Sequence, residues 1–226
     1  MTDDGFFREV NEELRSDKMR AFWARYSTLL IGGVVAIVIG TAAFAFYEYW
    51  TEKEASKSGD QFLAALNLVR DGKNDEALKT LDQLEKDGYG AYPVLARMRA
   101  AGVIAQKGDL AGAVAAFDKV SADTSVPQSI RDLAKLRAAL ILVDTGSYDD
   151  VASRVEALSS DGNPMRHSAR EALGLAAWKA GRGADATKLF KQISDDQAAP
   201  ANIRQFSDTM LDMLRSTGAT PAAAAG

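Results

Sequence analysis

The stretch that decides the fold is Ala65–Leu84, ALNLVRDGKNDEALKTLDQL, in which a glycine separates two apolar helical patterns. The glycine is Gly72, and Gly108, Gly146 and Gly181 follow it at successive intervals of 36, 38 and 35 residues. Each glycine comes after one helical pattern and before another, where the chain needs a left-handed or tight conformation to end a helix. The period therefore predicts a repeated helix-turn-helix unit.

Small and large residues recur at fixed distances from these glycines. Seven residues before them stand the small residues Ala65, Ala101, Ala139 and Gly174, and nine residues after them stand the larger Leu81, Phe117, Val155 and Phe190. A small residue in the first helix lets the second helix approach closely, and the large residue fills the space between them. A proline follows each unit, at Pro93, Pro127, Pro164 and Pro200, and is expected near the start of the next helix.

This pattern resembles the tetratricopeptide repeat (TPR) family, whose units are about 34 residues long. The match is partial, because the aromatic residue expected early in the first helix is replaced by Gln61, Arg97, Lys135 and Arg170. The resemblance implies an all-α solenoid of about four helical hairpins over 48–215. Ala201–Arg215 has an apolar side and no partner helix, as expected of a C-terminal capping helix. The low-complexity tail over 216–226 is expected to be disordered.

A second decisive stretch is Tyr26–Tyr47, YSTLLIGGVVAIVIGTAAFAFY, which contains no charged residue. A helix of this length spans about 33 Å, and the hydrocarbon core of a bilayer is about 30 Å thick. Aromatic residues flank the stretch, with Trp23 before it and Tyr49 and Trp50 after it. These features predict one transmembrane helix over 26–47, preceded by a short arm over 1–25.

Basic residues predict the orientation of this helix. Lys18, Arg20 and Arg25 lie just before the span, whereas Lys53 and Lys57 lie after it among three glutamates. The positive-inside rule then places the arm in the cytoplasm and the repeats on the other side, which in a bacterial inner membrane is the periplasm.

A cleaved signal peptide is the competing interpretation of the span. Ala43-Phe44-Ala45 has the small-x-small form that signal peptidase accepts, and cleavage there would leave a chain that begins at Phe46. The preceding region is long and acidic, whereas signal peptides begin with a short basic region, so we favour a retained anchor.

Composition argues against several classes of function. The net charge is −4 with 31 acidic and 27 basic residues, which leaves no basic footprint for nucleic acid. There is no cysteine, and the only histidine, His167, cannot form a metal site alone, so we expect it at the surface or as a cap. The acidic pairs Asp149-Asp150 and Asp195-Asp196 are expected at helix starts, where the helix dipole favours them. We expect a binding protein, not an enzyme, without cofactor, metal or small-molecule substrate.

The candidate binding surface is the inner face of the solenoid, which the first helices of the hairpins line. Alignment on the glycines places eight apolar residues there: Phe62, Leu66, Val69, Met98, Leu136, Leu140, Leu175 and Trp178. An open groove of this kind would hold apolar segments of other polypeptides. The same stripe would also arise if the first helices packed together and buried it as core.

The N-terminal arm is a second candidate surface. Residues 3–25 are predicted to be helical, and the apolar residues Phe6, Val10, Leu14, Phe22 and Trp23 follow one side of the helix toward the span. Such a helix could lie on the bilayer, dock on a membrane partner or simply support the span.

The arm also carries a more specific resemblance. It is similar to the opening of bacterial ancillary Sec-translocon subunits of the YfgM type in Phe7, Glu9, Val10, Glu12, Glu13, Leu14, Trp23 and Tyr26, followed by one span and a repeat domain. The resemblance implies an inner-membrane protein that links the export channel to periplasmic chaperones or unfolded polypeptide. Two alternatives remain open: a coordinator of envelope growth or cell division, and an anchor whose cytoplasmic arm sequesters a regulatory factor.

Overall fold

The computed structural model describes the backbone of residues 3–217 and the side chains of residues 19, 20 and 22–217. Within this part of the chain all regular secondary structure is helical, which confirms the predicted all-α class. The elements are α1 (Asp3–Arg70), α2 (Asn74–Asp87), α3 (Tyr92–Gln106), α4 (Leu110–Ala122), α5 (Gln128–Thr145), α6 (Tyr148–Val155), the short 3₁₀ helix η1 (Glu156–Ser159), α7 (Arg166–Lys179), α8 (Gly183–Ser194) and α9 (Ala201–Ser216).

The chain divides into two compact units, Met1–Ser56 and Lys57–Gly226. The described part of the first unit belongs to α1, whose apolar stretch is long enough to cross a membrane by length and composition. Its large side chains are exposed, including Ile31, Ile39 and Phe44. Because α1 continues without a break, the predicted boundaries at 25 and 47 mark changes of composition and not interruptions of the backbone.

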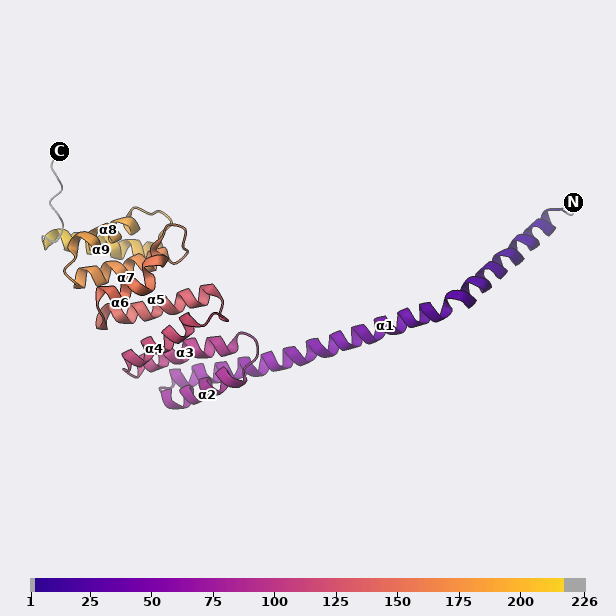
Figure 1. Ribbon diagram of the computed structural model, residues 1–226, viewed down its shortest axis with the longest axis horizontal. Helices are drawn as coiled ribbons and strands as arrows, with labels where there is room; N and C mark the ends of the chain where they lie inside the picture. The colour runs from indigo at the N-terminus through magenta and orange to yellow at the C-terminus, as the bar shows by residue number, and fades with distance from the viewer. Residues whose placement is uncertain (1–2, 218–226) are drawn as a thin grey trace, which may run out of the picture. The chain divides into compact units, whose positions relative to one another are not determined.

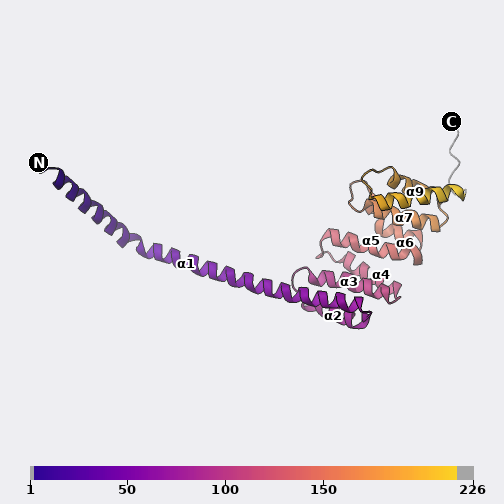
Figure 2. The same cartoon turned by 180° about the vertical axis from the view of Figure 1, so that it is seen from behind.

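The second unit is a stack of helical hairpins (Figures 1 and 2). The last turns of α1 pair with α2, followed by the pairs α3 with α4, α5 with α6, and α7 with α8. Helix α9 packs against α8 and α7 and covers the end of the stack. This confirms the four predicted hairpins and the capping helix.

Three of the four turn glycines have the left-handed backbone that only glycine adopts at low cost. The φ angles are 76° at Gly72, 89° at Gly108 and 73° at Gly181. Gly146 differs, with an extended backbone at φ −111°. There the next helix begins with a capping box, in which the Ser147 hydroxyl accepts from the Asp150 N–H and the Asp150 carboxylate accepts from the Ser147 N–H. The third hairpin thus turns by side-chain capping of α6 where the others use a left-handed glycine.

The small and large positions meet as predicted inside the hairpins. Ala65, Ala101 and Ala139 are fully buried, and the large residues Leu81, Phe117, Val155 and Phe190 are all buried opposite the small positions. The fit is tightest between Gly174 of α7 and Phe190 of α8, where a Cβ placed on the glycine would lie 2.9 Å from the ring. Helix α8 can therefore occupy its position only because residue 174 has no side chain.

Two arginines stand where a typical TPR has its early aromatic residue, and both make ion pairs. Arg97 of α3 donates to Asp123 at 2.7 Å, in the loop after α4. Hydrogen bonds from Ser125 and Arg97 lower the pKa of the Asp123 carboxyl to about 2. Arg170 of α7 is buried, donates to the carbonyl of Ser159 at 2.9 Å and pairs with Asp161. At these two positions ion pairs to the loops replace aromatic packing.

We expect Gly174→Ala to destabilise the protein by about 1–2 kcal/mol. Overpacking against Phe190 costs about 1–3 kcal/mol, and the better helix propensity of alanine returns less than about 1 kcal/mol. Gly102 is the matched control, because it lies in the middle of α3 with nothing within 4 Å of a built Cβ. Gly102→Ala should therefore stabilise by about 0.5–1 kcal/mol. Urea unfolding of both variants in the full-length chain measures the difference, and equal effects would refute the tight contact.

Candidate protein-binding face

The first helices of the hairpins, namely residues 57–70 of α1 together with α3, α5 and α7, present what we call the helix-A face. The structure separates the eight predicted face residues by burial. Phe62, Leu66, Val69, Met98 and Leu175 are partly buried, and four of these five pack against the core clusters of their hairpins. Leu136 is almost fully buried within the core that α5 shares with α6 and α7. Leu140 and Trp178 are 39% and 43% exposed and can meet a partner directly.

Leu140 and Trp178 line a groove of about 220 Å³ between α5 and α7. Val143 and Leu175 complete its apolar wall, and Asp144 and Lys179 lie at its rim. The Lys179 ammonium donates to the carbonyl of Val143 at 3.1 Å and also to that of Asp144. These bonds satisfy the carbonyl end of α5 and fix the rim.

A larger groove of about 430 Å³ lies on the other side of α5, between α5 and α3. Its floor comes from α4, with Leu110 and Phe117. Leu140 and Asp144 line this groove as well as the α5–α7 groove. The two grooves therefore adjoin at these two residues of α5, and we call them together the α5 groove.

Sequence reasoning missed two residues of this groove, Arg99 of α3 and Arg137 of α5. The signal was available, because both stand nine residues before a turn glycine, Gly108 and Gly146. The equivalent positions in the other repeats hold Leu63 and Ala172, which conceals the pattern. The groove between α3 and α5 therefore carries two basic side chains beside its apolar walls.

A family model described as a tetratricopeptide repeat-like domain matches residues 20–216. The chain belongs to this tetratricopeptide repeat-like family. Searches of curated proteins and of solved structures found no match. TPR-like domains are typically protein-interaction scaffolds without catalysis, and no catalytic family is indicated for this chain.

The predicted surface or capping position of His167 is wrong, because its side chain is buried in the TPR-like domain and bonds to another side chain. It is 7% exposed, and its Nε2 lies 2.8 Å from the Asp196 carboxylate, which also accepts from Arg166 at 3.0 Å. The bonds from His167, Ala198 and Arg166 lower the pKa of Asp196. The cluster joins α7 to the loop after α8. The prediction that Asp195-Asp196 begins a helix is therefore wrong, because Asp195 is the C-cap of α8.

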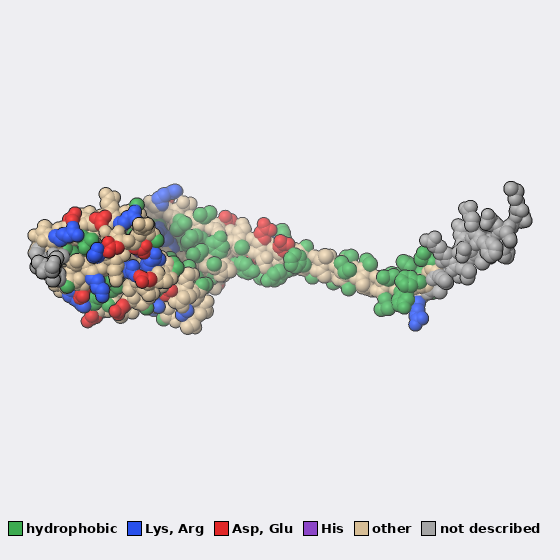
Figure 3. All heavy atoms as spheres, turned by 90° about the horizontal axis from the view of Figure 1, so that it is seen from above, with side chains coloured by type: hydrophobic (Ala, Val, Ile, Leu, Met, Phe, Trp, Pro, Cys, Tyr) green, Lys and Arg blue, Asp and Glu red, His purple; other side chains and the backbone are tan. Residues whose placement is uncertain are grey.

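The charged surface of the TPR-like domain carries both signs in close mixture, as Figure 3 shows for one face. Many of these charges pair with each other, for example Arg154 with Asp118 at 2.7 Å between α6 and α4. Within the described residues, no group of histidine, aspartate and glutamate side chains could hold a metal ion. The α5 groove, with Leu140 and Trp178 exposed in its walls, is the candidate surface for a partner.

The arm gives less information than the TPR-like domain. Phe6, Val10 and Leu14 have side chains outside the described residues, although the backbone there is helical. Phe22 and Trp23 are described and are more than half exposed. The Phe22 ring lies 4.8 Å from the Tyr26 ring at the beginning of the predicted span.

We expect Leu136→Ala and Leu140→Ala, two changes of identical chemistry in α5, to differ sharply in cost. Leu136 is core, so its truncation should cost about 2–4 kcal/mol. Leu140 is a partly exposed groove wall, so its truncation should cost less than about 1 kcal/mol. Chemical denaturation of the full-length chain in detergent, followed by circular dichroism, measures both. Similar costs would mean that the α5 groove is closed in solution.

Proposed function

We propose that this protein is an inner-membrane-anchored scaffold that holds its TPR-like domain in the periplasm and binds proteins near the Sec export channel. The observation that carries the proposal is the combination of an exposed apolar helix with an open, partly apolar α5 groove. An apolar helix with this exposure is stable when lipid surrounds it. A groove with Leu140 and Trp178 exposed suits apolar segments of chaperones or of emerging substrates.

The topology in this proposal rests on the basic residues before the span. Lys18, Arg20 and Arg25 precede it, while the glutamates after it offset Lys53 and Lys57. The link to the export channel rests on the arm and its similarity to ancillary translocon subunits. A cell-division or envelope-growth coordinator would use the same anchor and the same groove with other partners.

The exposed Phe22 and Trp23 favour a second candidate, in which the arm is the binding surface and the TPR-like domain is secondary. The two candidates place the partner on opposite sides of the membrane. They are therefore separable by experiment.

The chain contains no cysteine, so single cysteines can report its topology. We expect a membrane-impermeant maleimide to label Ser160→Cys in intact spheroplasts, because residue 160 is exposed on the domain. Met19→Cys, exposed on the arm, should react only after lysis. The reverse pattern would contradict the N-in orientation. Release of the chain from membranes by alkaline carbonate would contradict the anchor itself.

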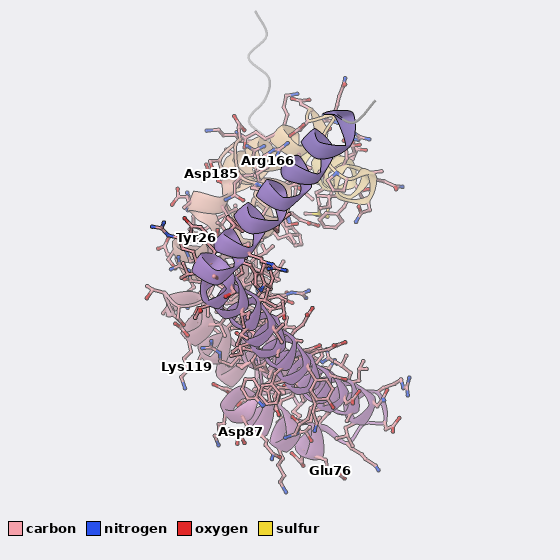
Figure 4. The ribbon with its side chains drawn as sticks, turned by 90° about the vertical axis from the view of Figure 1, so that its right-hand side faces the viewer. Tyr26, Glu76, Asp87, Lys119, Arg166 and Asp185 are labelled. Atoms are coloured by element: carbon pink, nitrogen blue, oxygen red, sulfur yellow. The ribbon has the colours of Figure 1, made fainter. Side chains whose placement is uncertain are left out.

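Photocrosslinking from single positions tests the binding surface. A photoreactive amino acid at Leu140 or Trp178 should crosslink export-channel subunits, periplasmic chaperones or nascent substrates. The matched control is Lys119, which is exposed on α4 outside the α5 groove (Figure 4). Crosslinks from Phe22 or Trp23 alone would support the arm instead, and crosslinks to division or envelope-growth proteins would replace the export channel as partner.

A further inference from the structure

We infer that the part of the α5 groove between α3 and α5 is a receptor for a polypeptide segment that carries a carboxylate beside an apolar side chain. The inference deepens the proposed scaffold function and rests on it. It goes further by naming the chemistry of the partner and the residues that select it, Arg99 and Arg137.

The first observation is that these two arginines have no partner among the described residues. No hydrogen bond or ion pair is found for either side chain among the described residues, whereas Arg97, Arg154 and Arg166 all pair with aspartates at 3.0 Å or less. The Arg99 Nε is also shielded from solvent without an acceptor, a condition that it shares with the Arg131 Nε elsewhere. A guanidinium that is partly desolvated and unpaired is ready to accept a carboxylate, which it can hold with two parallel hydrogen bonds.

The second observation is that the two arginines stand at the same level of the solenoid. Each lies nine residues before the turn glycine of its repeat. Both line the same groove, one from α3 and the other from α5. The only acidic side chain in the lining is Asp144, two helical turns after Arg137 and about 10 Å further along α5. The groove is therefore basic at the level of Arg99 and Arg137 and acidic toward the end of α5.

The third observation is Gly102, which lines the groove between the two ends. It lies in the middle of α3 with an ordinary helical backbone, and nothing lies within 4 Å of a built Cβ. Neither the turn nor the packing of this chain requires glycine here, in contrast to Gly174. Its effect is to deepen the groove beside Leu110 and Leu140, where an apolar side chain of a partner can enter.

These features fit a peptide better than a small anion. Apolar walls from Leu110 and Ile141 would contribute little to an inorganic anion. The groove adjoins the Trp178 site through the shared Leu140, so an extended or helical segment can occupy both. Charge complementarity at the arginines then selects acidic segments and sets their direction.

The test uses the full-length chain in nanodiscs of neutral phosphatidylcholine and three fluorescein-labelled amphipathic helical peptides. The peptides share their leucine positions and carry glutamate, glutamine or lysine at all others. Fluorescence polarisation should rank their affinity as glutamate above glutamine above lysine. The double variant Arg99→Glu/Arg137→Glu should bind the glutamate peptide about tenfold more weakly and the lysine peptide more tightly.

Two further variants separate charge from shape. Lys119→Glu changes charge outside the groove and should leave the ranking unaltered. Gly102→Leu adds a side chain to the groove where nothing lies within 4 Å of a built Cβ, and it should weaken all three peptides. Circular dichroism melts of each variant confirm that the domain remains folded.

The outcomes distinguish this inference from the scaffold proposal beneath it. If all three peptides bind equally and the double arginine variant changes nothing, the arginine receptor is overturned while the scaffold stands. If no peptide binds at all, both are overturned. If the arginine pair instead governs binding to vesicles of anionic lipid and not to peptides, the ligand is a membrane surface and the inference is again wrong.

Discussion

The close approach of the two helices within each hairpin is the constraint on which the rest of the structure depends. Helix α8 reaches α7 because Gly174 offers no side chain to the Phe190 ring, and the alanines at the equivalent positions are likewise fully buried. Each hairpin is thereby a thin slab with its large residues inside. Slabs of this kind cannot bury their outer faces alone, so they stack, and the last one needs α9 as a cover.

The α5 groove follows from how these slabs stack. Helix α5 packs directly against both α6 and α7, which commits Leu136 and Ala139 to the core. Between α3 and α5 the floor is supplied by α4, and Gly102 leaves the space above it open. The candidate binding surface is therefore the space that remains where adjacent first helices are held apart by the second helix between them. Its polarity is decided by the few residues that face this space.

The sequence predicted most of the fold because the repeat signal lies in steric positions. The small position of Ala65 and the large position of Leu81 recur in register in every unit, because a bulky residue at the small position would push the two helices apart. The helix-A face was harder to predict. The helical period alone places Leu136 and Leu140 on the same stripe, although Leu136 belongs to the core and Leu140 to the groove wall. The two residues differ only in what covers them: α6 and α7 pack over Leu136, whereas Leu140 is left partly exposed. Similarly, His167 meets Asp196 across 29 residues of sequence, and no local pattern reports such a contact.

The proposed membrane anchor and a shallow groove suit each other energetically. A fully buried leucine or tryptophan contributes about 1.5–3 kcal/mol, and association in solution costs at least about 4 kcal/mol before any affinity appears. With Leu140 and Trp178 only partly enclosed, the groove by itself would bind weakly. If a partner sits in or passes through the same bilayer, tethering raises its effective concentration to about the millimolar range, and weak contacts then suffice. Such contacts also release quickly, which a scaffold that serves successive partners requires. In the receptor that we infer, Arg99 and Arg137 add selectivity to this weak binding. Their charge favours acidic over basic segments and does not require deep burial of the partner.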